Sequence, residues 1–171
     1  MKLNKKVEIV LNNQINAEFS SAFLYLAMSA WFENKGLKGF ANWMRIQYLE
    51  ENTHALKFHD YILKCAGKVT LQPIESVKTE WKGILDAFNE TYKHELKITE
   101  MIGNCYEVAL AEKDHATASM LQWYIDEQTE EESNVLTIID QINLIGENGQ
   151  AIYLLDKELS TRVFVDPTLT I

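Results

Sequence analysis

Residues 40–61 read FANWMRIQYLEENTHALKFHDY, and this stretch decides the fold. Its apolar side chains recur at alternating intervals of three and four, the pattern of a helix that packs one face into a core. Glu51 and His54 interrupt the stripe three residues apart, so both side chains project from one face toward a common point. A lone Glu-x-x-His arises often by chance, so its weight depends on what the rest of the chain places at the same depth.

Three further stretches carry an apolar stripe that polar residues interrupt near its midpoint. The interrupting residues are Glu18 in residues 5–33, Glu95 in residues 82–112, and Gln128 and Glu131 in residues 115–145. In a bundle of aligned helices these midpoints meet at one level. Four carboxylates and an imidazole in an apolar core would be severely destabilised unless they were protonated or bound to cations. Four negative charges match two divalent ions, and oxygen ligands with a single histidine favour iron or manganese over structural zinc.

The same periodicity predicts an all-α chain: a four-helix bundle with one long crossover between its second and third helices, plus a short fifth helix. We expect helices at residues 5–33, 37–64, 82–112, 115–145 and 150–159, so that residues 1–160 form one bundle domain and residues 161–171 an extended tail. Asp114 is expected to cap the fourth helix. The inward stripe of the third helix is expected to run through Trp81, Leu85, Phe88, Tyr92, Glu95, Thr99, Ile102 and Tyr106.

Connection lengths predict how these helices are arranged. Short links make the first two and the last two long helices antiparallel hairpins. The middle connection, of about 17 residues, could reach roughly 55 Å, whereas a helix of about 28 residues is only about 42 Å long. It can therefore span the bundle and leave the second and third helices parallel. Apolar residues alternate along it and predict an ordered strap rather than a floppy loop: Val69, Leu71, Ile74 and Val77.

The charge balance argues against several classes of partner. With 25 acidic and 16 basic residues the net charge is -9, which disfavours binding to nucleic acid or to an anionic membrane and leaves cationic partners open. Cys65 and Cys105 form no CxxC pair, which fits free thiols in a reducing compartment. The chain shows neither a secretory signal pattern nor a stretch of transmembrane length, so we expect a cytoplasmic location.

A second acidic group neighbours the layer ligands in sequence but leans toward the adjoining face. Its members are Glu50, Glu127, Glu130 and Glu132. Such runs are usually solvated surface. If the second and fourth helices adjoin, however, Glu50, Glu127 and Glu130 could bind a further cation beside the first two.

Two features keep a plainer interpretation open. Tyr25, seven residues after Glu18 on the same stripe, is either a hydrogen-bond or electron donor to the site or a packed core tyrosine. The polar layer itself could be a buried hydrogen-bond network that fixes register, or, with the helical phase shifted by one residue, a solvated face.

The motifs around these residues resemble those of bacterial non-haem ferritins, and the resemblance covers essentially the whole chain. The segments that carry it are Glu18 with Ala22 and Tyr25, residues 50–55 (EENTHA), His94 with Glu95, residues 122–124 (QWY), residues 127–132 (EQTEEE) and residues 154–159 (LLDKEL). The resemblance implies three iron positions. A first iron would have Glu18, Glu51 and His54; a second would share Glu51 and have Glu95 and Glu131, with Gln128 close by; a third would use Glu50, Glu127, Glu130 and Glu131.

By the same resemblance the chain is expected to be a ferroxidase that stores iron. It would oxidise Fe(II) to Fe(III) with O2 or H2O2 and keep the ferric mineral inside a hollow homo-oligomeric shell of about 24 subunits. Apart from the resemblance, the fifth helix and the apolar tail residues Val163, Phe164 and Val165 need partners to cover them, which predicts association. Haem-binding relatives place a methionine after the bridging glutamate, whereas Asn52 stands here, so no haem is expected.

Two other classes of function are open. A rubrerythrin-like peroxidase or a di-iron oxygenase would use the same core. No rubredoxin-type CxxC pairs occur, however, and Ile98 stands where a second Glu-x-x-His would place its histidine. A metal-free helical interaction module would use the acidic layer only for structure, and an iron titration separates it from a ferritin.

Overall fold

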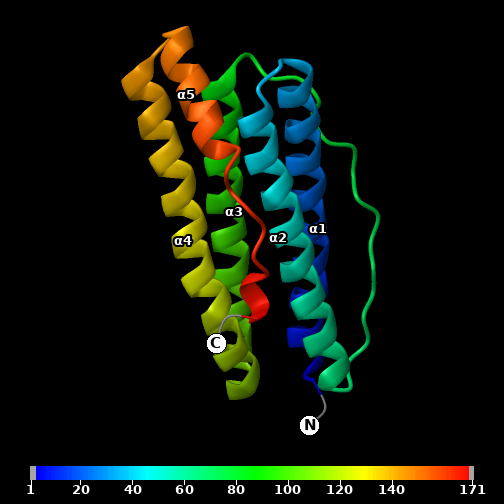
Figure 1. The fold of residues 1–171 in the computed structure, drawn as a ribbon. Coiled ribbons are helices and arrows are strands. Elements are labelled where there is room, and N and C mark those ends of the chain that lie inside the picture. Colours follow the sequence, from blue (N-terminus) through cyan, green and yellow to red (C-terminus); the bar gives the residue numbers. More distant parts are fainter. Residues whose placement is uncertain (1–2, 170–171) are drawn as a thin grey trace.

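The computed structural model of the chain describes residues 3–169, which form helices and no strands (Figure 1). The elements are α1 (Lys5–Asn34), α2 (Lys38–Lys64), α3 (Ile84–Ala111), α4 (His115–Ile145), α5 (Gly149–Leu159) and the short 3-10 helix η1 (Pro167–Leu169). The all-α prediction is confirmed, and each expected boundary of the five α-helices lies within two residues of the observed one. Among the described residues, no helix is both long and apolar enough to cross a membrane.

Polar side chains cap three of the helices at their N-termini. Asp114 accepts hydrogen bonds from the backbone N–H of Thr117 at 3.1 Å and from its hydroxyl at 2.8 Å, which confirms the predicted cap of α4. Asn4 and Asn148 accept from backbone N–H groups at the starts of α1 and α5. These contacts satisfy donors that have no partner within the helix.

The long crossover lies along α1 as an ordered strap (Figure 1). The Asn12 side chain accepts from the N–H of Thr70 at 2.6 Å and donates to the carbonyl of Lys68 at 3.0 Å, while Glu8 accepts from the Lys68 N–H at 2.9 Å. Polar side chains of α1 therefore hold the strap along its first residues. The apolar alternation contributes as expected at residues 69, 74 and 77, which are half-buried, but Leu71 is 68% exposed.

The core consists of two apolar clusters, one toward each end of the bundle. One cluster holds Phe32, Phe40, Phe88 and Val135, and the other holds Leu11, Phe58, Ile102 and Leu121, each with its neighbours. In every long helix the predicted polar residues fall between the segments that supply the two clusters. The prediction that these residues share one level of the bundle is confirmed.

The expected inward stripe of α3 is partly wrong. Phe88, Glu95 and Ile102 are buried as predicted, but Leu85 lies at the surface, and Tyr92, Thr99 and Tyr106 are only half-buried. The buried positions of α3 that the predicted stripe leaves out are Ala87, Thr91, Ile98, Cys105 and Ala109. Both stripes fit a helical period, and Tyr92, Thr99 and Tyr106 lie at the edge of the buried face, where the Thr99 hydroxyl donates to Glu132.

Helix α5 docks on the start of α2. The Asp156 carboxylate accepts from the N–H groups of Gly39 at 2.7 Å and Phe40 at 3.0 Å, and so supplies the cap that α2 lacks at Leu37. A Cβ atom at Gly39 would lie only 1.6 Å from the Asp156 carbonyl oxygen, so this close approach requires glycine.

Beyond α5 the chain turns back along α2, and η1 lies against that helix (Figure 1). The expected extended tail is wrong for residues 167–169, because Asp166 accepts from the N–H of Thr168 at 2.9 Å and initiates the short 3-10 turn. The last two residues of the predicted tail, 170 and 171, lie outside the described residues.

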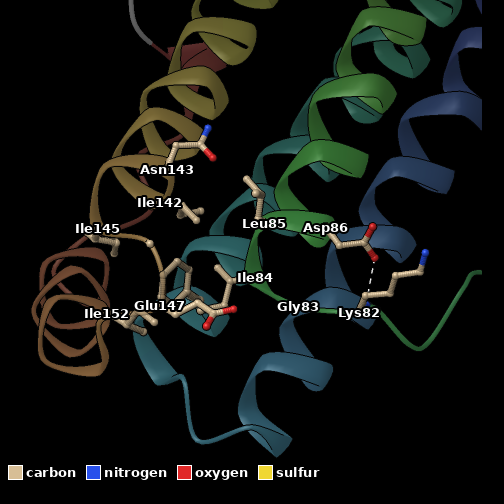
Figure 2. Close-up of a pocket in the computed structure, with 12 residues that line it drawn as sticks. Lys82, Gly83, Ile84, Leu85, Asp86, Ile142, Asn143, Ile145, Glu147 and Ile152 are labelled. Atoms are coloured by element: carbon tan, nitrogen blue, oxygen red, sulfur yellow. Dashed lines mark hydrogen bonds between the residues drawn. The ribbon is translucent and has the colours of Figure 1, made fainter.

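A pocket of about 440 Å³ opens at the end of the bundle, between the start of α3, the end of α4 and α5 (Figure 2). Aliphatic side chains such as Ile84, Ile142 and Ile152 line it together with charged residues such as Lys82 and Asp86. No predicted metal ligand lines this pocket, so the polar layer is a separate feature deeper in the bundle.

Candidate metal centre

Six predicted ligands form one buried layer in the middle of the bundle. Their side chains are between 0% and 4% exposed: Glu18 on α1, Glu51 and His54 on α2, Glu95 on α3, and Gln128 and Glu131 on α4. The layer is therefore screened from solvent by the apolar clusters above and below it, and charges within it interact strongly. The interpretation that a shifted phase turns these residues to solvent is excluded.

The first group of converging ligand atoms belongs to Glu18, Glu51 and His54. One such atom from each residue lies within 4.8 Å of the other two, and His54 Nδ1 is 3.8 Å from Glu51 Oε2. Gln14 donates to Glu18 Oε1 at 2.9 Å and orients that carboxylate. The i, i+3 spacing read from the sequence thus places the carboxylate and the imidazole of α2 beside the carboxylate of α1.

Glu95 on α3 and Glu131 on α4 are the other two carboxylates of the layer, and hydrogen bonds fix the orientation of both. The Tyr25 hydroxyl donates to Glu95 Oε1, and Gln128 Nε2 donates to Glu95 Oε2 at 3.1 Å. Gln47 donates to Glu131 Oε2 at 2.7 Å. Tyr25 is completely buried and bound to a site carboxylate, so it both packs in the core and donates a hydrogen bond to the layer.

A second group of ligand atoms adjoins the first through the other nitrogen of the imidazole. His54, Glu127 and Glu131 also place one ligand atom each within 4.8 Å of one another, and His54 Nε2 is 3.9 Å from Glu127 Oε1. Helices α2 and α4 therefore do converge at this level, as the prediction of a further cation position required.

The other residues of the second acidic group lie differently. Glu50 is bound to Arg162, whose Nη2 donates to Glu50 Oε2 at 2.7 Å. Glu130 is exposed. Glu132 accepts from the Thr99 hydroxyl at 2.6 Å and so supports the polar layer from its edge.

Burial makes ionisation of the layer carboxyls costly in the absence of cations. It raises the pKa of Glu51 well above its ordinary value, and the charges of Glu95 and Glu18 add to the effect. Burial, with the charge of Glu131, raises the pKa of Glu95 to about 8. It also raises the pKa of Glu50 to about 8, although Arg162 opposes this shift, and that of Glu127 to about 7. Near neutral pH the metal-free layer therefore retains protons that bound cations must displace.

Burial shifts the pKa of the His54 imidazole in the opposite direction. Burial lowers the pKa of His54, so the ring is neutral and has a free lone pair for a cation. Burial likewise raises the pKa of Tyr25 well above its ordinary value, so its phenol keeps its proton and acts only as a donor to Glu95.

Two buried atoms of the layer have no hydrogen-bond partner among the described residues: Glu51 Oε2 and His54 Nε2. Buried polar atoms are nearly always paired, and an orphaned one requires an explanation. Both belong to groups that bind divalent cations, and both sit where several carboxylates repel one another. The layer therefore fits a cation site better than a self-contained hydrogen-bond network.

Three supporting residues were not identified as part of the site from the sequence. Gln14 and Gln47 stand four residues before Glu18 and Glu51 on the same stripes, so their polarity was a usable signal. Arg162 lies in the tail, far from the layer in sequence, and no periodic pattern connects it with α2.

Comparisons with known proteins agree on one family. Residues 10–145 match the ferritin family in its ferritin-like domain. The bacterial non-heme ferritin of Staphylococcus haemolyticus is 40% identical over 162 residues, covering 95% of this chain and 98% of that protein. The Campylobacter jejuni bacterial non-heme ferritin is 41% identical over 155 residues, covering 91% and 93%.

Solved structures show the same fold. A closed form of the Archaeoglobus fulgidus ferritin, engineered by site-directed mutagenesis, superposes with a TM-score of 0.95 at 46% identity, covering 96% of this chain and 100% of that one. The open-pore ferritin of the same archaeon gives a TM-score of 0.94 at 46% identity, covering 95% and 100%.

Proposed function

The chain belongs to the ferritin family, and on that premise we propose that it is a ferroxidase which oxidises Fe(II) at an intra-subunit di-iron centre and stores the ferric product. Family membership supports iron storage and ferroxidase activity in general terms. The observation that carries the specific proposal is the convergence of Glu18, Glu51 and His54 on one point, with an orphaned ligand atom on Glu51. The orphaned Nε2 of His54 faces Glu127 in the adjoining group.

In this proposal the two substrate ions share Glu51. The first is bound by Glu18, Glu51 and His54, and the second by Glu51, Glu95 and Glu131, with Gln128 beside the pair. Holding both ions in one layer lets each give one electron to the same oxidant, O2 or H2O2. Carboxylates favour the more highly charged ferric ion, and this preference drives the oxidation.

Protein groups control protons and orientation in this reaction. Because the pKa of Glu95 is about 8 in the metal-free layer and that of Glu51 is also raised, ferrous ions displace protons as they bind. Tyr25 and Gln47 then hold Glu95 and Glu131 in place as ligands. Hydrolysis of the ferric product releases further protons during mineral growth.

Storage requires an enclosed volume that a single bundle lacks, so we place the chain in a closed homo-oligomer of about 24 subunits. Exposed apolar residues support association: Leu144, Tyr153, Leu154, Val163 and Val165 are between 59% and 88% exposed. A cytoplasmic location, the absence of haem, and a third iron position using Glu50, Glu127, Glu130 and Glu131 belong to the same proposal.

The rival functions predict different behaviour of the same layer. An oxygenase would retain both metals through many turnovers, yet Ile98, which is 2% exposed, packs in the core where a second Glu-x-x-His would place a ligand. A weaker second position suits a centre that must release its product. In a metal-free interaction module, buried atoms without hydrogen-bond partners would only destabilise the core.

Anaerobic addition of Fe(II) to the metal-free protein, followed by air, tests the proposal. We expect rapid growth of ferric absorbance for about two ions per subunit. Glu51→Ala and His54→Ala should abolish this phase while leaving the assembly intact in sedimentation. His59→Ala is the matched control, because His59 lies on the same helix and pairs with Asp60 at the surface. Oxidation at the buffer rate, or equal rates in all four proteins, would contradict the proposed centre.

A further inference from the structure

Arg162 reaches the metal layer from the C-terminal tail. Its guanidinium lies over the Trp43 ring at 4.9 Å, and Asn42 donates to the carbonyl oxygens of Leu159 at 3.1 Å and Arg162 at 3.0 Å. Both Trp43 and Asn42 belong to α2, the helix that supplies Glu51 and His54. The start of the tail is therefore tied to the helix that carries the centre, and the arginine side chain has a defined position.

The guanidinium makes two short contacts with α2. Nη1 donates to Gln47 Oε1 at 2.6 Å, and Nη2 donates to Glu50 Oε2 at 2.7 Å. The ion pair is shielded, since the Arg162 and Glu50 side chains are 23% and 13% exposed. A forked guanidinium that binds two acceptors is geometrically specific, so Arg162 selects this arrangement more strongly than a point charge would.

These contacts reach a ligand of the centre through Gln47. A guanidinium has donors and no acceptor, so the Gln47 atom that faces Arg162 must be the carbonyl oxygen. The amide nitrogen of Gln47 then points the other way and donates to Glu131 Oε2 at 2.7 Å. Arg162 thereby fixes which way the Gln47 amide is turned and, through it, the orientation of Glu131.

Glu50 is the carboxylate that Arg162 withholds from a further cation. Arg162 binds both Glu50 and Gln47, and Gln47 donates to Glu131, so Glu50 lies on the side of α2 that faces the second group of converging ligand atoms. A divalent ion there would gain Glu50 as a ligand only if the guanidinium moved away. The positive charge of Arg162 also repels an incoming cation at short range, where salt screening is weak.

We propose that Arg162 is a specificity-determining residue of the centre: a tethered cation that occupies Glu50 and restricts the layer to two tightly bound metal ions. This inference rests on the proposed di-iron function. A third ion enters the position formed by Glu127, Glu131 and Glu50 only by displacing the guanidinium, which removes the side-chain contacts of Arg162 between the tail and α2.

Equilibrium titration with Zn²⁺, a redox-inert probe, tests the inference without any turnover. Wild-type protein should bind about two ions tightly and a third weakly, whereas Arg162→Gln should bind the third about tenfold more tightly or better. Arg45→Gln is the matched control, because Arg45 is the only other arginine, lies exposed on α2 and stacks on Tyr48 at 4.9 Å. It should leave all three affinities unchanged.

A double variant shows whether the gain passes through Glu50. In Arg162→Gln/Glu50→Gln the third affinity should return to the wild-type level or below it. A tenfold gain that persists in the double variant overturns the assignment of Glu50 as the withheld ligand. Arg162→Lys keeps the positive charge but cannot bind two acceptors as a guanidinium does. Its affinity for the third ion should lie between those of wild type and Arg162→Gln. This variant replaces Arg162→Gln if the latter fails to assemble.

Wild-type protein provides a measurement that needs no substitution. The N–H groups of residues 160–162 donate to the carbonyls of Asp156, Glu158 and Leu159. Their hydrogen exchange should be slow with two equivalents of Zn²⁺ and should accelerate when excess Zn²⁺ fills the third position. If the third affinity is equal in wild type and Arg162→Gln and exchange does not change, the inference is wrong while the two-ion centre stands. If no tight Zn²⁺ binding occurs in any variant, the proposed function itself fails.

Discussion

At the residue scale, Glu95 shows how strongly the layer depends on its protonation state. Burial, reinforced by the charge of Glu131, raises its pKa to about 8 from an ordinary 4.5. A carboxyl whose pKa rises on folding stabilises the native state while it is protonated, and the contribution is lost as the pH rises from the unfolded value through the folded one. As the pH rises from 4.5 to about 8, the metal-free fold should therefore lose the stability that protonated Glu95 contributes.

Glu95→Gln isolates this contribution, because the amide oxygen can still accept from Tyr25 but the charge is gone. We predict that the variant gains stability over wild type as the pH rises, by up to about 1.4 kcal/mol per pH unit in that window. Guanidinium unfolding with a chelator, at pH values near 6 and near 8.5, measures the difference. An equal difference at both pH values would show that Glu95 does not titrate there.

Tyr25 acts on the same carboxylate from the other side. Tyr25→Phe removes the hydroxyl that donates to Glu95 while it keeps the ring in the core. We predict unchanged binding stoichiometry and Fe(II) oxidation slower by about tenfold, the usual cost of losing a group that orients a metal ligand. Stopped-flow absorbance measures the rate. Tyr61→Phe is the control, since Tyr61 bonds the Thr117 hydroxyl at 2.9 Å in the apolar cluster beyond the layer, and an equal loss there would indicate a general packing effect.

At the element scale, the contact between α5 and α2 depends on one glycine. Gly39→Ala would place a Cβ atom 1.6 Å from the Asp156 carbonyl oxygen, so α5 must move away and release the carboxylate that caps α2. We predict faster hydrogen exchange in residues 149–159 with the four long helices preserved. Gly103→Ala, in α3, is the matched control, because a Cβ there meets nothing within 4 Å. It should stabilise the protein by about 0.5–1 kcal/mol. Equal exchange of α5 in both variants would contradict this account.

The sequence predicted these elements because helical periodicity and capping residues are local signals. The midpoint of each stripe also predicted the depth of the layer, since α-helices rise by a constant amount per residue. The phase of α3 was less determined: a stripe through Tyr92 and a stripe through Thr91 fit the same period, and only packing against α1 and α4 selects the second. Contacts such as that of Asp156 with Gly39 join residues far apart in sequence and leave no periodic trace.

The residues of the candidate site also include some that local sequence patterns predict and some that only the tertiary structure brings to the site. Residues such as Glu18 and Glu51 could be predicted because a charged residue in an apolar stripe conflicts with its surroundings, and that conflict is visible in sequence. Arg162 could not, because an arginine in a tail conflicts with nothing until the tail folds back on α2. The group withheld from metal, Glu50, is consequently defined by tertiary structure and not by its motif.

At the scale of the whole molecule, the centre and the storage function separate physically. All six layer residues belong to one bundle, so the proposed two-ion site needs no residue from a neighbouring subunit. Enclosure of a mineral requires other subunits, and the exposed apolar residues of α5 and the tail are the surface most in need of cover. Leu154, for example, is 67% exposed on a helix whose other face packs against the bundle.

Leu154→Glu places a charge on that surface and should break the assembly into smaller species in sedimentation velocity, because a carboxylate buried in an apolar interface is costly. Gln150→Glu, one turn earlier on α5, adds the same charge at an exposed position without removing apolar area and should leave the assembly intact. Because the layer lies within each bundle, the dissociated variant should still bind about two Fe(II) ions per subunit and oxidise them at the wild-type initial rate. Its ferric product should precipitate instead of staying in solution as an enclosed mineral. If the dissociated variant no longer binds two ions, neighbouring subunits must complete the centre. If it oxidises Fe(II) but does not keep the ferric product in solution, each bundle performs the oxidation and the assembly performs the storage.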